Sequence, residues 1–407
     1  MGDSNMGEEG SLHGIRVIEI AQGVSGPYCG KLLAGLGAEV IKVEPPSGDT
    51  ARREGPFPND VPDVERSGLF LHLNTGKRSC TLNLACKDGQ SLLRRLLTVG
   101  NIDVLILGHR HSELEALGLD PAVLVREYPS LIVVNVSPFG LTGPRRNWLG
   151  TELVVYAASG YMSLTGAAER EPIKSYGSLI EYQAGAQAAL GTLAALFSRD
   201  ATGVGQVVDV SQMEAGTFLL GGVEQIAYFH RRVVLRNGTR LLGFAPQHSY
   251  PSTIRPCADG FVHCHSNNRH LDLLGVLIPH PRLSDPEVLG ALMGHADEID
   301  QIMDEWLADK SKRDVVAAAQ DLRLPFTEVM TPGEVMADPH HKVRASFVVV
   351  NHPGAGPIQQ PGAPFRMGES PWVTGAAPTL AEANADIAAR LGLEPAEIAR
   401  ARALEVV

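Results

Sequence analysis

Aromatic residues are scarce in this chain: phenylalanine, tryptophan and tyrosine together make up 5% of its 407 residues. Cysteines are few as well, and the five of them are scattered with no CxxC pair. An odd count without paired spacing argues against a disulfide framework and against a cysteine-ligated zinc knuckle. We therefore expect buried free thiols and a cytoplasmic protein, because the cytoplasm keeps thiols reduced.

Positive charge is also in short supply, since the formal net charge is -11. An acidic surface argues against a nucleic-acid partner or an anionic membrane surface, although a locally basic cleft can still take a small anion. The most apolar stretch, residues 178–198, is dominated by alanine and glycine and contains two glutamines, so we do not expect it to span a membrane. Residues 1–12 are polar and acidic, which predicts a disordered leader rather than a secretory signal.

Several motifs of common enzymes are missing. The glycine-containing loop GVSGPYCG lacks the dinucleotide-binding GxGxxG spacing and the lysine of a phosphate-binding loop. The nucleophile elbow GxSxG of serine hydrolases does not occur. His263 and His265 alternate on an expected strand, but no third ligand is indicated, so we predict no metal site.

What the sequence does contain is an alternation of strands and helices. A β-branched run at 15–22 is followed by a helix pattern and then by the apolar run AEVIKVEPP. Further short buried runs stand at 102–109 and 129–140. This order predicts an α/β fold with a doubly wound, mostly parallel sheet, in which ligands gather in the loops at the carboxyl ends of the strands. Composition changes near residue 226, which indicates a second, smaller domain.

Basic residues recur in those strand-end loops. Each one alone is most often a solvated surface charge, but together at one sheet edge they would form an anion site. The set is Lys42, Arg52, Arg53, Lys77, Arg78, Arg110, Arg145 and Arg146.

Glu181 is the one charged residue within the apolar stretch 178–198, and it stands near the start of the helix expected there. The spacing Ser178-x-x-Glu181 is typical of a capping box, in which serine and glutamate each bond a backbone N–H of the first turn. A helix with no polar face is expected to be buried on all sides. Its first turn would then lie inside the protein or in a cleft, where a carboxylate can also be a nucleophile or a base. Both interpretations of Glu181 stand at this point.

Five ordered motifs give the chain a wider resemblance. Among them are RVIEIAQGVSGPYCGKLLAGLGAEVIKVEPPSGD, LNTGKRSCTLNL, VVNVSPFGLTGP and FSRDATGVGQVVDVSQMEA. With the C-terminal DPHHKVRASFVVVNHPGAGPIQQPGAPFRM, they resemble the family III CoA-transferases, which include formyl-CoA and carnitine CoA-transferases and alpha-methylacyl-CoA racemase.

The resemblance implies an architecture. It predicts a large CoA-binding domain from 13–225 with a six-stranded sheet, a small α+β domain from 226–330, and a segment from 331–407 that returns to the large domain. It also implies an interlocked homodimer. Coenzyme A or acyl-CoA would be a substrate, with no permanently bound cofactor, and a carboxylic acid would be the second small-molecule partner.

The same resemblance implies site residues. CoA would lie across the strand-end loops, and Arg110 would take the place of the family's CoA-binding arginine. The expected CoA contacts are Val24, Ser25, Arg52, Lys77, Arg78, Arg110, Ser137, Phe139 and Gly140. Val24 aligns with a glutamine that transferases of the family often have, and Gln22 stands two places earlier.

Glu181 matches the family's catalytic aspartate, ten residues before Gly191, with a side chain one methylene longer. The implied activity is an acyl-CoA:carboxylate CoA-transferase that works through an anhydride and a glutamyl-CoA on Glu181, with helix-end N–H groups near the developing oxyanion.

Two alternatives remain open. A 2-methylacyl-CoA racemase or another CoA-thioester isomerase pairs the helix carboxylate with a histidine, where this chain has Thr151 in the stretch Gly150-Thr151-Glu152. His248 could supply that histidine from elsewhere. The second alternative is a CoA-binding protein with little turnover, in which Glu181 only caps its helix.

Overall fold

The computed structural model describes residues 10–231, 233–240, 250–266 and 271–407. The chain forms two compact units. Of the described residues, those within 10–159, 176–219 and 340–407 form the first unit, and those within 160–175 and 220–339 form the second. Residues 160–175 therefore group with the small unit, which the sequence did not predict. The small unit also begins earlier and ends later than the expected 226–330, since it takes in 220–225 and 331–339, and only 340–407 of the C-terminal segment groups with the large unit.

The large unit is built on a six-stranded sheet, as predicted, and all its strands are parallel, in the order β3-β2-β1-β4-β5-β6. Its strands are β1 (Arg16–Ile20), β2 (Glu39–Glu44), β3 (Arg78–Thr81), β4 (Val104–Leu107), β5 (Ile132–Ser137) and β6 (Val207–Ser211). All four residues of β4 are fully buried, which explains their continuous apolar sequence, because helices cover a parallel sheet on both faces.

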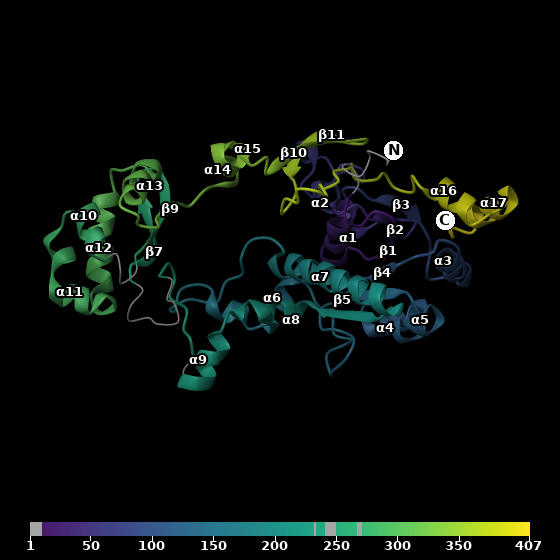
Figure 1. Cartoon of the computed structure of the whole chain (residues 1–407), viewed down its shortest axis with the longest axis horizontal. Helices are drawn as coiled ribbons and strands as arrows, with labels where there is room; N and C mark the ends of the chain where they lie inside the picture. The colour runs from purple at the N-terminus through teal and green to yellow at the C-terminus, as the bar shows by residue number, and fades with distance from the viewer. Residues whose placement is uncertain (1–9, 232, 241–249, 267–270) are drawn as a thin grey trace. The chain divides into compact units, whose positions relative to one another are not determined.

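Helices cover the two faces of this sheet (Figure 1). One core lies under α3 (Lys87–Val99), α4 (His111–Leu117), α5 (Pro121–Glu127) and α16 (Asn384–Arg390). The other lies under α1 (Ser25–Gly35), α7 (Leu179–Thr202) and α8 (Gln212–Thr217). Neighbouring strand residues alternate between the two cores, as Leu105 and Ile106 show.

The large unit also contains shorter elements around the sheet. These are α2 (Gly68–Leu73), α6 (Glu152–Ala158), the antiparallel pair β10 (Phe347–His352) and β11 (Gly356–Pro361), and α17 (Pro395–Ala403). The C-terminal segment joins the sheet edge, since the Ala383 N–H donates to the Ser79 carbonyl.

The small unit has its own apolar core. It combines the antiparallel strands β7 (Ser252–Cys257), β8 (Gly260–His265) and β9 (Thr327–Glu328) with α9 (Val223–His230), α10 (Leu271–Leu277), α11 (Pro286–Gly290), α12 (Ala296–Leu307), α13 (Lys312–Asp321) and α14 (Pro332–Ala337). The helix α15 (Pro339–Val343) begins at the boundary between the units.

The expected leader differs from the structure in its last residues. Residues 1–9 lie outside the described residues. Gly10 is buried, and the Leu12 N–H donates to the Leu36 carbonyl at 2.8 Å, so residues 10–12 are ordered against the end of α1. A Cβ at Gly10 would approach the Leu36 oxygen to 2.3 Å, which leaves room there only for glycine.

Candidate active site

Most of the predicted residues lie toward the carboxyl edge of the sheet. β1 lies between β2 and β4. The chain runs outward from β1 through β2 to β3, then crosses back to β4 and runs outward the other way to β6, and this reversal of strand order beside β1 is the arrangement that creates a ligand crevice. Four residues separate the end of β1 from the start of the helix α1. Its first residue, Ser25, accepts a hydrogen bond from the Gln212 amide at 2.9 Å, so the start of α8 lies beside the start of α1.

The helix α7 approaches α1 very closely. A Cβ at Gly185 would lie 2.5 Å from the Ser25 carbonyl oxygen, so glycine is what allows the two backbones to touch. Tyr182 of α7 packs edge-on against Tyr28 of α1, with ring centroids 4.9 Å apart. The first two turns of α7, which include Glu181, are thereby fixed beside the start of α1.

Glu152 holds the first turn of α7. The N–H groups of Ile180 and Glu181 donate to its two carboxylate oxygens, each at 3.1 Å. Ser178 occupies the N-cap position but makes no side-chain capping hydrogen bond. The capping-box interpretation is therefore wrong, and Glu152 from α6 takes that role because its carboxylate offers two acceptors at once.

The expectation of helix-end donors for an oxyanion is also wrong for these two groups. The N–H groups of Ile180 and Glu181 are already bonded to Glu152. Glu181 itself is half-buried at the start of the helix.

The expectation that α7 is buried on all sides is wrong within this chain. One face carries Leu190 and Phe197, which are 68% and 82% exposed. The opposite face, with Ala184 and Ala188, is buried in the sheet core. The small residues of α7 therefore allow close packing on one side only.

A basic pair lies next to Tyr182. The Lys31 ammonium donates to the His72 carbonyl at 2.7 Å and lies 3.2 Å from Nδ1 of the His72 ring, and that ring centroid is 6.2 Å from Tyr182. Burial and the nearby Lys77 charge lower the pKa of Lys31 to about 8. Burial and the Lys31 charge lower the pKa of His72 to about 4, so His72 is neutral at pH 7.

Three of the predicted anion-binding cations lie instead inside a buried ionic network at the ends of β1 and β2. Lys42 contacts Glu19 and Asp49 at 2.8 and 2.7 Å, and Lys77 contacts Glu19 at 2.7 Å. Burial alone would lower the pKa of Lys42, but the two carboxylates raise it above its usual value. Burial lowers the pKa of Lys77 to about 8.

Arg52 is the third of these cations. It is fully buried and bonds both oxygens of Glu44, at 2.7 and 2.8 Å, and Glu65 at 3.0 Å. Arg52 and Lys77 were expected to contact CoA, but the structure gives their charges internal carboxylate partners. Arg52 follows β2 in a strand-end loop, where a ligand contact is expected, whereas Lys77 directly precedes β3, and the burial of both side chains was not visible in the sequence.

The remaining predicted contacts lie along the same edge except for Arg78, which is the first residue of β3 and stands at the amino end of that strand. Arg78 pairs with Asp386 at 2.9 Å, and Arg110 pairs with Glu113 and donates to the Asn147 carbonyl at 3.0 Å. Val24 precedes α1 and is buried. The nearby Gln22 side chain accepts the Thr50 N–H at 3.3 Å.

The loop after β5 holds the last three. Ser137 is buried at the end of β5, and Phe139 packs edge-on against Trp148 with centroids 5.9 Å apart. Gly140 has φ +76°, and the next N–H, that of Leu141, donates to Asp209 at 3.0 Å. Contact of these residues with CoA stays a prediction.

Sequence reasoning missed Glu152, Gln212 and the Lys31–His72 pair. Glu152 stood in the stretch Gly150-Thr151-Glu152, where only Thr151 was weighed. The signal that could have identified Glu152 was an acidic side chain next to an expected helix start. His248, the alternative racemase histidine, lies outside the described residues.

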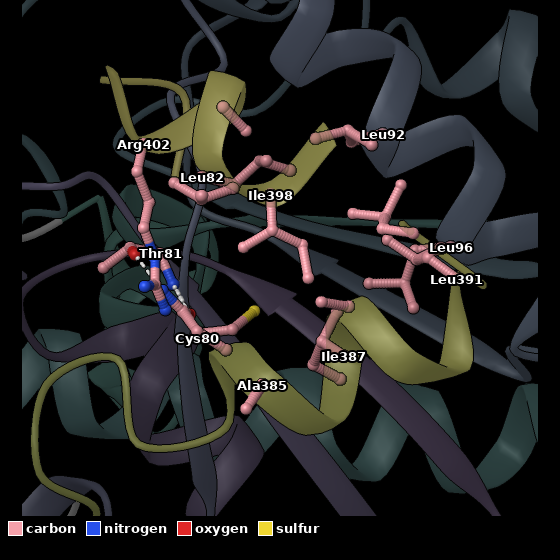
Figure 2. Close-up of a pocket in the computed structure, with 15 residues that line it drawn as sticks. Cys80, Thr81, Leu82, Leu92, Leu96, Ala385, Ile387, Leu391, Ile398 and Arg402 are labelled. Atoms are coloured by element: carbon pink, nitrogen blue, oxygen red, sulfur yellow. Dashed lines mark hydrogen bonds between the residues drawn. The ribbon is translucent and has the colours of Figure 1, made fainter. Parts of the chain in front are cut away.

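A separate apolar cavity of about 140 Å³ lies between β3, α3, α16 and α17 (Figure 2). Its walls are mainly aliphatic, with Leu92, Leu96, Ile387 and Ile398 among them, and Arg402 stands at one end. None of the expected CoA contacts lines it, and neither does Glu181.

Within the described ranges, no three His, Cys, Asp or Glu side chains gather as a metal-ligand set. The His263 and His265 rings stack with centroids 6.1 Å apart. All five cysteines, each in the described part of the chain, are free thiols. Of the helices described, none is long and apolar enough to cross a membrane.

Known proteins resemble this chain along most of its length. It is 31% identical to succinyl-CoA–D-citramalate CoA-transferase of Chloroflexus aurantiacus, over 97% of this chain and 98% of that protein. It is 30% identical to succinyl-CoA:(R)-benzylsuccinate CoA-transferase subunit BbsE of Thauera aromatica, over 94% and 95%.

A solved structure agrees with these relatives. The crystal structure of a CAIB/BAIF family protein from Brucella suis superposes with a TM-score of 0.81 at 26% identity and covers 94% of this chain and 100% of that one. The profile described as CoA-transferase family III matches residues 12–384. The chain is therefore a member of CoA-transferase family III and an enzyme of that family.

Proposed function

We propose that this CoA-transferase moves CoA from an acyl-CoA to a carboxylic acid through a covalent intermediate on Glu181. The observation that carries the proposal is the placement of Glu181, a half-buried carboxylate in the first turn of α7, beside the start of α1. Relatives named for succinyl-CoA support succinyl-CoA as the donor. A second carboxylic acid is the acceptor.

The chemistry needs only one carboxylate. Glu181 attacks the thioester carbonyl, the CoA thiolate leaves, and a mixed anhydride forms. The thiolate then attacks the Glu181 carbonyl of the anhydride, which releases the donor acid and leaves a glutamyl-CoA thioester. The acceptor carboxylate attacks that thioester, expels the thiolate and forms a second anhydride. The thiolate attacks the acceptor's acyl carbon in that anhydride, which forms the new acyl-CoA and restores the Glu181 carboxylate.

Two copies of the chain are proposed to pair in solution. The apolar face of α7 with Leu190 and Phe197 supports this, because exposed apolar surface of this kind favours association. Light scattering coupled to gel filtration measures the mass.

Free thiols in all five cysteines agree with a cytoplasmic location, which we also propose.

Intact-mass spectrometry after incubation with succinyl-CoA tests the proposed reaction. We expect an adduct with the wild-type protein and none with Glu181→Gln. Exchange of deuterium at the α-carbon of a 2-methylacyl-CoA without an adduct would favour the racemase. Binding of CoA with neither signal would favour a binding protein with little turnover.

A further inference from the structure

We propose that Glu152 is the positioning residue of this active site, and the proposal rests on the function proposed above. Its carboxylate fixes the first turn of α7 and thereby determines where the Glu181 side chain starts. The two hydrogen bonds to Ile180 and Glu181 are equal in length, 3.1 Å, and each uses a different carboxylate oxygen.

The platform that carries Glu152 is itself rigid. Glu152 is the first residue of α6, and the next turn of α6 buries Val155 and Tyr156 completely. At the other end of α6, the Thr217 hydroxyl of α8 donates to the Ser159 carbonyl at 3.2 Å. A carboxylate on such a support holds a position rather than following the helix that it binds.

The packing around Gly216 joins the three helices. A Cβ at Gly216 of α8 would lie 2.7 Å from the Ser159 side chain and 2.9 Å from that of Ile180. Ile180 is fully buried. In Figure 1 the helices α6, α7 and α8 lie together beside β5. The Glu152 contact is thus the polar part of a tight junction whose apolar part is Ile180.

The arrangement has a chemical consequence. The backbone N–H of the residue that would react, Glu181, is held directly by Glu152, so the main chain at the reactive residue cannot shift without breaking that bond. Near-attack geometry is sensitive to displacements of about 1 Å, which can cost about 100-fold in rate. Glu152 therefore affects the rate at which Glu181 attacks the thioester much more than it affects the binding of CoA.

Glu152→Gln tests the proposal. The amide keeps the size of the side chain but turns an NH₂ group toward one of the two N–H donors, so one hydrogen bond is lost. With succinyl-CoA as the probe, we expect kcat and the rate of adduct formation to fall about 10- to 100-fold, while KM for succinyl-CoA stays within about threefold. Amide hydrogen exchange at Ile180 and Glu181 should accelerate.

Asp120→Asn is the matched control. Asp120 caps α5 through the Ala122 N–H at 2.8 Å, so the change also converts a helix-capping carboxylate to an amide, away from Glu181. Its kcat should remain within about twofold of the wild type. Glu152→Asp serves if Glu152→Gln does not fold. It keeps both acceptor oxygens, so slow exchange at Ile180 and Glu181 should be retained while kcat still falls because the helix start is displaced.

A folded Glu152→Gln protein with wild-type kcat overturns the proposal, and so does a fall in kcat of the same size in Asp120→Asn. A wild-type protein that forms no adduct and transfers no CoA overturns the proposed function instead. Amide exchange still separates the two cases, because it reports whether Glu152 holds the start of α7 without any turnover.

Discussion

The two halves of the sheet's carboxyl edge use their charged residues differently. At the ends of β1 and β2, the cations Lys42, Lys77 and Arg52 are buried against carboxylates. At the junction of α6 and α7, the Glu152 carboxylate is held by two backbone N–H groups and stands next to the candidate nucleophile. Charge at a strand end can therefore serve the fold as readily as it serves a ligand.

The largest effect is expected from breaking the buried network. Lys42→Met removes the ammonium that lies between Glu19 and Asp49, two carboxylates with no exposure to solvent. Uncompensated buried charge should lower the free energy of unfolding by about 3–5 kcal/mol, measured by denaturant titration. The control is Arg94→Gln, which breaks the exposed pair with Glu127 and should cost about 0–1 kcal/mol. Equal losses of free energy of unfolding in the two variants would show that the buried network stabilises the fold no more than an exposed ion pair does.

The contact between α1 and α7 gives the next effect. Alanine in place of glycine within a helix normally stabilises it by about 1 kcal/mol. Gly185→Ala should instead destabilise the protein by about 1–3 kcal/mol, because the new methyl meets the Ser25 carbonyl. In Gly191→Ala the methyl meets only a movable side-chain methyl of Val208, so the loss should be smaller. A stabilised Gly185→Ala protein would contradict the close approach of the helices.

Arg110 tests whether the other half of the edge binds the substrate. Unlike Arg52, it is partly exposed, and its partner Glu113 is also near the surface. Arg110→Gln should raise KM for the acyl-CoA about tenfold, which corresponds to about 1.4 kcal/mol, and should leave thermal stability nearly unchanged. Steady-state kinetics measure the first quantity and a thermal melt the second. Unchanged KM would remove Arg110 from the CoA site.

The effect that is smallest at neutral pH concerns the pH dependence of stability. The pKa of His72 lies near 4, below its ordinary value of 6.5, because burial and the Lys31 charge disfavour the protonated ring. Between those two values the unfolded chain binds a proton that the folded chain does not, so stability falls as the pH drops from 6.5 to 4. Between pH 4 and 6.5, His72→Gln should reduce the slope of the free energy of unfolding against pH by up to about 1.4 kcal/mol per pH unit. Above pH 7 the curves of the variant and the wild type should run parallel. An unaltered slope would show that His72 titrates as in the unfolded chain.

The sequence allows the strands of the sheet to be predicted, but not the partners with which the charged residues pair. Short apolar runs that alternate with helix patterns predict β1, β4 and β5 as strands, because strands buried on both faces of a parallel sheet are almost continuously apolar. The pairing of Lys42 with Glu19, 23 residues apart, depends on which strands become neighbours, and no local pattern encodes that.

The start of α7 shows the same limit at the site. The spacing of Ser178 and Glu181 correctly predicts where the helix begins but not what caps it. The cap comes from Glu152, 29 residues before Glu181, through a contact that exists only once α6 and α7 are packed. The local pattern left Glu181 open as a cap or a nucleophile, the family resemblance matched it to the catalytic carboxylate, and the tertiary structure supplied the residue that holds it.

The most direct test of the account is to locate the intermediate on the chain. The wild-type protein is incubated with succinyl-CoA, treated with borohydride, which reduces a thioester to an alcohol, and mapped by peptide mass spectrometry. We expect a reduced residue at Glu181, and an unmodified peptide when succinyl-CoA is omitted. Turnover with an unmodified Glu181, or reduction at another carboxylate, would contradict it.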